Sequence, residues 1–220
     1  MGRSSDARDR LLEAAIDLIW RSSYGAVGVD AICEKAGVKK GSFYHFFASK
    51  DDLVVAALDR QFESRRPVLD AIFSPSRPPV ERLRRYLENA YERQLEVREE
   101  HGRVLGCFHN AVGNECIQQR PEVAAKVQGV IASFHRYLET TLRDAKAEGH
   151  ARIDDPAASA KVLFAYVQGA LLQARIHDDP ELLRDLAQTG LPLVGIHVDA
   201  PATKPTTSPR KPSPRKDARA

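Results

Sequence analysis

The chain has 220 residues, of which 43% are hydrophobic and 29% are charged, a balance typical of a globular protein that buries a core without metals or disulfides. Its formal net charge is only +3, and residues 201–220 carry six basic side chains against one acidic one, so charge alone does not indicate a nucleic-acid binder. The sequence has no run of about 18 apolar residues and no secretory signal, so we expect a cytoplasmic protein without a membrane span.

Helical periodicity dominates the chain up to about residue 192, and strand-like alternation is nearly absent, which predicts an all-α fold of about nine helices. Capping residues and helix breakers set the predicted ends: Ser49 caps one helix with Asp52 three residues later, and Gly37 ends another. The predicted helices span residues 6–22, 29–35, 39–46, 50–73, 80–99, 104–118, 121–148, 156–177 and 180–191.

Residues 29–50 carry the most informative pattern. They predict two short helices joined by a tight turn, where Gly37 supplies the left-handed backbone conformation. The expected apolar seam between these helices consists of Ile32, Ala36, Val38, Phe43 and Phe46. The outward face of the second helix holds donors suited to phosphate oxygens and base edges, namely Lys39, Lys40, Ser42, Tyr44 and His45, and Gly41 permits close backbone approach. Lys50 adds a cation at the next helix start, and the whole pattern predicts a DNA-binding helix-turn-helix.

The segment Gly-Val-Lys-Lys-Gly-Ser-Phe-Tyr-His-Phe-Phe-Ala-Ser-Lys-Asp-Asp-Leu, residues 37–53, closely resembles the recognition helix and following cap of TetR-family repressors. The resemblance is strong over residues 8–60 and implies a homodimer whose first three helices bind a palindromic operator. It also implies that helices five to seven surround a ligand cavity and that the last two form a bundle between subunits. Lys40, Gly41, Tyr44 and Lys50 match family positions that touch DNA, Ser42 and His45 are expected to read base edges, and Lys39 is a further expected contact.

One position departs from the family pattern. Many members have Thr or Ser at the N-cap of the second helix, where the hydroxyl also binds a phosphate, but this chain has Gly28 there. That contact is expected to be missing or to come from the backbone.

The predicted sensing half contains a Gly106-Cys107 pair, which resembles one TetR branch that includes sensors of electrophiles and of small unsaturated acids. The resemblance implies a reactive thiol at Cys107, and Arg175 is expected to favour its thiolate by charge pairing. The alternative is a small buried apolar residue. The candidate lining residues of the cavity are Cys107, Phe108, His109, Asn110, Tyr86, Phe134, Tyr166, Gln168 and Arg175.

The other cysteine and histidine positions predict no further chemistry. Cys107 and His109 project to different sides of a helix, so we expect neither a metal nor any other cofactor. Cys33 is expected to be structural. On an intact helix Cys116 lies ~13 Å from Cys107, too far for a disulfide.

The chain after Asp199 is rich in Pro, Ser and basic residues, and Ser-Pro-Arg-Lys occurs twice, at residues 208–211 and 213–216. This composition predicts disorder over residues 199–220. Two interpretations stay open: a solvated extension without a role, or a basic arm that adds weak, sequence-independent DNA affinity.

The sequence therefore predicts a DNA-binding domain over residues 1–50, a helical ligand-binding and dimerisation domain over residues 51–198, and a tail. We expect a repressor that binds operator DNA as a homodimer and is released by a small-molecule effector or by modification of Cys107. The alternative is an architectural DNA-binding protein that uses the tail and senses nothing. No nucleophile elbow, P-loop or dinucleotide fingerprint occurs, so we do not expect an enzyme.

Overall fold

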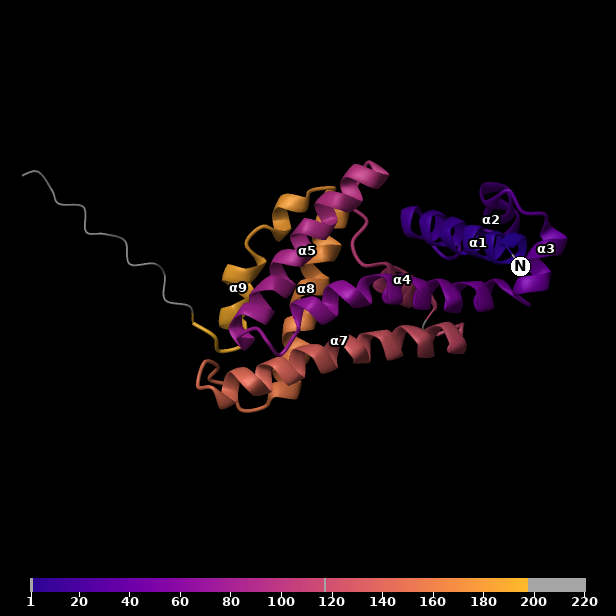
Figure 1. Ribbon diagram of the computed structural model, residues 1–220. Coiled ribbons are helices and arrows are strands. Elements are labelled where there is room, and N and C mark those ends of the chain that lie inside the picture. The colour runs from indigo at the N-terminus through magenta and orange to yellow at the C-terminus, as the bar shows by residue number, and fades with distance from the viewer. Residues whose placement is uncertain (1, 117, 198–220) are drawn as a thin grey trace, which may run out of the picture.

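The structure is a computed structural model that describes residues 2–116 and 118–197 (Figure 1). Within these ranges the chain forms α-helices and one 3-10 helix, with no strand, which confirms the predicted all-α fold. The helices are α1 (Gly2–Arg21), α2 (Val29–Ala36), α3 (Lys40–Phe46), α4 (Lys50–Ile72), α5 (Pro79–His101), α6 (Phe108–Cys116), α7 (Pro121–Ala147), α8 (Pro156–His177), η1 (Pro180–Leu183) and α9 (Leu186–Leu193). The predicted disordered tail lies outside the described residues.

Local caps account for several helix starts. The Ser49 hydroxyl accepts the backbone N–H of Asp52 at the start of α4, and the Asp155 carboxylate accepts N–H groups of Ala157 and Ala158 at the start of α8. Both caps satisfy donors that have no partner inside the helix. These starts agree with the predicted ones because a capping side chain acts within one turn of its own residue.

Three elements differ from the prediction, and the first is α1, which begins at Gly2 instead of residue 6. The sixth helix was expected from residue 104 but begins at Phe108, because Gly106 has a left-handed φ of 67° and interrupts the helix. The expected last helix is divided into η1 and α9. The predicted spans were wrong at these three places.

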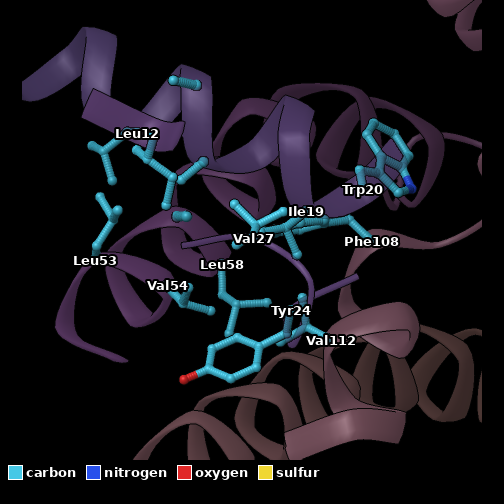
Figure 2. Close-up of a cluster of buried hydrophobic side chains, with 14 of the residues drawn as sticks. Leu12, Ile19, Trp20, Tyr24, Val27, Leu53, Val54, Leu58, Phe108 and Val112 are labelled. Carbon is cyan, nitrogen blue, oxygen red and sulfur yellow. The ribbon is translucent and has the colours of Figure 1, made fainter. Parts of the chain in front are cut away.

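The N-terminal helices share one apolar core with the helices behind them. Leu12, Ile19 and Val27 pack with Leu58 of α4 and with Phe108 of α6 (Figure 2). The hydrophobic cluster is thus continuous across residue 50, and the division into domains at that residue remains a prediction.

A second apolar cluster joins the far half of α4 to α5, α7, α8, η1 and α9. α4 contributes Leu58 to the first cluster and Phe62 and Leu69 to the second, and α7 runs alongside it (Figure 1). α4 therefore packs into both the N-terminal core and the helical bundle.

Candidate DNA-binding helix and effector cavity

A tight turn at Gly37 joins α2 to α3, as the sequence predicts. Gly37 is left-handed with φ of 61°, and its N–H closes the end of α2 on the carbonyl of Glu34. Ile32 and Phe43 are fully buried between the two helices. The backbone and the seam therefore fix the orientation of α3 against α2.

The opposite face of α3 is open to solvent. Exposed residues at its start and along it are Lys39, Lys40, Gly41, Ser42, Tyr44 and His45. Tyr44 is 53% exposed, and its ring lies edge-on against the buried ring of Phe43. A Cβ built on Gly41 meets nothing within 4 Å, so that part of the helix permits close approach of another molecule. The face has the size and the hydrogen-bonding groups of a helix that enters the major groove.

Two neighbours modify this face. Lys40 pairs with Asp30 of α2 at 2.7 Å, and both side chains are exposed, so the pair is readily exchanged for a phosphate. Gly28 caps α2 without a side-chain hydrogen bond, as the departure from the family pattern implied.

Lys50 is placed differently from the expected DNA contact. Its ammonium group donates to the backbone carbonyls of Tyr24 at 2.6 Å and Val27 at 2.8 Å, and it lies 3.8 Å from the centre of the Tyr24 ring. Burial lowers the pKa of Lys50. The side chain holds the loop between α1 and α2, and it does not point to a phosphate in this conformation.

The placement of Lys50 leads to a prediction about salt dependence. A lysine that contacts phosphate at both half-sites adds about 2 to the slope of log affinity against log salt, so Lys39→Met should lower the magnitude of that slope by about 2. Lys50→Met should leave the slope unchanged and lower the melting temperature, because two carbonyls lose their charged donor. Binding titrations at several salt concentrations, with thermal melts, test both variants. A reduced slope for Lys50→Met would show that Lys50 reaches DNA.

The segment before α6 is held by side chains of three other helices. Gln94 of α5 bonds both to the N–H of Gly106 at 2.9 Å and to its carbonyl at 3.2 Å. The Leu105 carbonyl accepts the indole N–H of Trp20 at 3.0 Å and the guanidinium of Arg175 at 3.2 Å. α1, α5 and α8 therefore meet at this non-helical stretch, which places Cys107 at the start of α6.

A cavity of about 120 Å³ lies beside this segment, between α4, α5, α6, α7 and α8. Six of the candidate residues line it, namely Cys107, Phe108, His109, Tyr86, Phe134 and Gln168. Trp20 of α1 also lines it, so the N-terminal core reaches the cavity directly.

Three candidates lie outside the lining. Asn110 donates to the amide oxygen of Gln168 at 2.8 Å, so it contacts a lining residue but does not line the cavity itself. The hydroxyl of Tyr166 hydrogen-bonds to Thr189 instead. Arg175 donates to the carbonyls of Leu105 and Trp20, so it holds the backbone next to the lining residues without lining the cavity itself.

The expected effect of Arg175 on Cys107 is wrong. Burial raises the pKa of the Cys107 thiol, and the backbone N–H groups of Asn110 and His109 offset only part of that rise. Arg175 does not reach the thiol because its guanidinium is engaged with two carbonyls. Cys107 is accordingly a protonated thiol at neutral pH.

His109 is buried, lines the same cavity and is neutral. Burial lowers its pKa to about 4, and its Nε2 lies 3.0 Å from the carbonyl of Leu58 in α4. Because a carbonyl only accepts, Nε2 carries the proton in this pair. His109 thus joins the start of α6 to the middle of α4.

Among the lining residues that the sequence reasoning missed, the polar ones lie on α4 and α5. They are Gln61, Arg65, Asn89, Arg93 and Gln94. A signal was present, since Arg65 falls between Phe62 and Leu69 at the spacing of the buried face of α4. Charged residues on long helices are usually exposed to solvent, so the sequence reasoning did not consider Arg65 as a lining residue.

No group of three or more His, Cys, Asp or Glu residues in the described ranges is placed to hold a metal ion. None of the helices in residues 2–116 and 118–197 is long and apolar enough to cross a membrane.

These features define the class: a helix-turn-helix DNA-binding protein with a helical domain that lines a small cavity. Residues 11–57 match the family described as bacterial regulatory proteins, tetR family, and residues 79–189 match the Tetracyclin repressor-like, C-terminal domain. The chain belongs to the TetR family of bacterial regulatory proteins.

Individual relatives agree with this assignment. The chain is 31% identical to the transcriptional regulator AcuR of Cereibacter sphaeroides, over 84% of each chain, and 28% identical to the transcriptional repressor NemR of Escherichia coli, over 78% of this chain and 85% of that one. A regulatory protein TetR from Rhodobacter sphaeroides superimposes with a TM-score of 0.74 at 30% identity, covering 84% of this chain and 96% of that one. The prediction of a DNA-binding transcriptional regulator, and of a non-enzyme, is confirmed by these relatives.

Proposed function

We propose that the protein is a ligand-responsive repressor that binds a palindromic operator as a homodimer. The open face of α3 carries this proposal, because it presents two lysines, a serine, a tyrosine and a histidine on a helix whose other side is fixed in the core. We expect release when a small molecule occupies the cavity beside Cys107; modification of Cys107 is the alternative route, which the raised pKa of its thiol disfavours. In the DNA-bound dimer the two recognition helices are about 34–36 Å apart and enter successive major grooves, and release follows because the effector favours a conformer with a different spacing.

The homodimer is supported by an apolar stripe on α8. Val162, Leu172 and Ile176 are 52%, 48% and 63% exposed, although each is a large apolar side chain. Val162, Gly169 and Ile176 are seven residues apart, with Ala165 and Leu172 between them, which is the spacing of a helix seam. Within one subunit this stripe faces solvent, so a second copy of the chain is the natural cover.

Coupling between the cavity and DNA is supported by α6. Its first residues line the cavity, and near its other end the carboxylate of Glu115 accepts the backbone N–H groups of Tyr24 at 3.1 Å and Gly25 at 2.9 Å. These two residues lie in the middle of the loop between α1 and α2. A shift of α6 therefore acts on the loop that leads into the helix-turn-helix.

A mobility-shift assay on the DNA upstream of the protein's own coding region separates the two routes of release. Because burial keeps the Cys107 thiol protonated, a quinone should release the wild type no faster than Cys107→Ser. Release of the wild type alone would identify Cys107 as the chemical sensor. If neither the wild type nor Cys107→Ser binds this DNA sequence-specifically, the proposed repressor function is wrong.

A further inference from the structure

We propose that the protein has a second ligand site, between α4, α5 and α7, which binds a compact phosphate monoester with a planar aromatic body. The site is a cavity of about 320 Å³, lined by these three helices and by the loop between α4 and α5. The inference goes beyond the proposed function, because it does not depend on which molecule occupies the cavity beside Cys107.

This second cavity is distinct from the one beside Cys107. Among the described lining residues the two cavities share Phe62 alone, and the ring of Phe134, which lines the first cavity, packs against Phe62 with the ring centres 5.7 Å apart. The second cavity is also remote from the recognition helix. Its residue Arg66 lies roughly 24 Å along α4 from Lys50, at ~1.5 Å per residue, and α3 lies at that other end of α4 (Figure 1). Operator DNA bound at α3 therefore does not supply the phosphate.

Three guanidinium groups from three helices line the second cavity. They belong to Arg66 of α4, Arg82 of α5 and Arg136 of α7. Asp144 is the only carboxylate in the described lining, so three guanidinium groups against one carboxylate leave two excess positive charges. A phosphate monoester carries about 1.5 to 2 negative charges near neutral pH, and guanidinium groups bind its oxygens through paired N–H donors. The charge of the lining therefore matches a phosphate dianion better than a monoanion.

Arg82 is a buried cation whose donors are incompletely paired. It is 4% exposed and pairs with Asp144 at 2.9 Å. Its Nε has no hydrogen-bond acceptor within the described part of the chain. A guanidinium has five N–H donors, and a buried donor without an acceptor costs free energy. An anion that enters beside this pair supplies further acceptor oxygens to Arg82.

Arg136 and Arg66 are exposed and can turn towards an incoming anion. Arg136 donates to the hydroxyl of Ser133 at 2.8 Å, and no carboxylate of the described residues pairs with it. Arg66 pairs with Glu63 at 2.6 Å, but both side chains are about half exposed, so this ion pair contributes little and is readily exchanged for a phosphate. The two arginines therefore supply the mobile half of the proposed site, opposite the fixed Arg82.

The rest of the lining determines the body of the ligand. The rings of Phe73 and Tyr137 stack with their centres 4.9 Å apart, and Phe62 lies buried beside them in the same lining. The Tyr137 hydroxyl donates to Asp70 and is neutral, because burial and this hydrogen bond raise its pKa to about 12. These rings offer an apolar surface to a planar aromatic group. The volume falls at the low end of the roughly 300–1,000 Å³ of small-molecule sites, which requires a compact ligand.

The test compares a phosphate monoester with ligands that lack one of its features. Phenyl phosphate is titrated by calorimetry into the full-length protein, in a buffer free of phosphate. The comparison ligands are benzenesulfonate, which has the same ring and a single negative charge, phenol, which has no charge, and inorganic phosphate, which has no ring. We expect phenyl phosphate to bind about tenfold or more tightly than each of the three.

Variants then assign the binding to this cavity. Arg136→Gln and Arg66→Gln should each lower the affinity for phenyl phosphate about tenfold, and Arg136→Lys should retain part of it. Arg143→Gln is the matched control, because Arg143 lies on the same helix as Arg136, pairs with Glu139 and does not line the cavity. All of these side chains are exposed, so circular dichroism and operator binding should match those of the wild type.

Three results would overturn the inference. They are the absence of phenyl phosphate binding, equal affinity for any one of the three comparison ligands, and wild-type affinity in both Arg136→Gln and Arg66→Gln, which would place the ligand elsewhere. A mobility-shift assay without ligand reports separately on the repressor. Specific operator binding together with any of these results refutes the phosphate site alone, and absence of specific binding refutes the repressor whatever the titrations show.

Discussion

Replacing Tyr44 by alanine is expected to abolish operator binding while the protein remains a folded dimer. Tyr44 is 53% exposed on the outer face of α3, so its removal opens no cavity in the core. One DNA contact contributes about 1–3 kcal/mol, and the change removes it from both half-sites. The expected loss is therefore roughly thirtyfold to ten-thousandfold in affinity, measured by mobility shift.

Tyr44→Phe separates the hydroxyl from the ring. The phenyl ring can keep its edge-on contact with Phe43, so this variant should lose only the hydrogen bond and show an intermediate affinity. Light scattering should give the same mass for both variants as for the wild type. Wild-type operator affinity for Tyr44→Ala would refute the assignment of α3 as the recognition helix.

Leu172→Asp is expected to convert the dimer to a monomer and to abolish operator binding as a consequence. Leu172 is 48% exposed within one subunit and lies in the middle of the apolar stripe on α8. In the proposed interface the new carboxylate is buried against an apolar partner surface, which costs several kcal/mol for each unpaired charge. A monomer holds one half-site only, so its operator affinity falls steeply.

Val68→Asp is the matched control for this change. Val68 is also an exposed apolar residue, at 38%, but it lies on α4 and outside the stripe. Size-exclusion chromatography with light scattering at micromolar concentration should show monomer for Leu172→Asp and dimer for Val68→Asp. A dimeric Leu172→Asp would place the subunit interface elsewhere.

Features that depend on neighbours in the chain were predictable from the sequence. The helical class follows from the apolar period, and the turn at Gly37 follows from the need for a left-handed residue. The start of α4 follows from Ser49 and Asp52, which act across a single turn. The outward face of α3 was predictable for the same reason, because Phe43 occupies the inner side of so short a helix.

Features that depend on distant partners were decided only by the tertiary structure. The start of α6 is set by Gln94 and Trp20, which hold residues 105 and 106 from other helices. Lys50 turns inward because two carbonyls of the α1–α2 loop lie within its reach. Arg65 faces the cavity because α4 packs into the bundle on that side.

Local backbone preferences and helical periodicity act over a few residues, so they were sufficient to predict the fold class, the helix-turn-helix and most helix ends. The tertiary structure alone decided the direction of Lys50, the protonation of Cys107 and the composition of the cavity. These properties arise from burial and from hydrogen bonds between residues far apart in the chain, as between Arg175 and Trp20. Such pairings depend on how the helices pack, which no local pattern encodes.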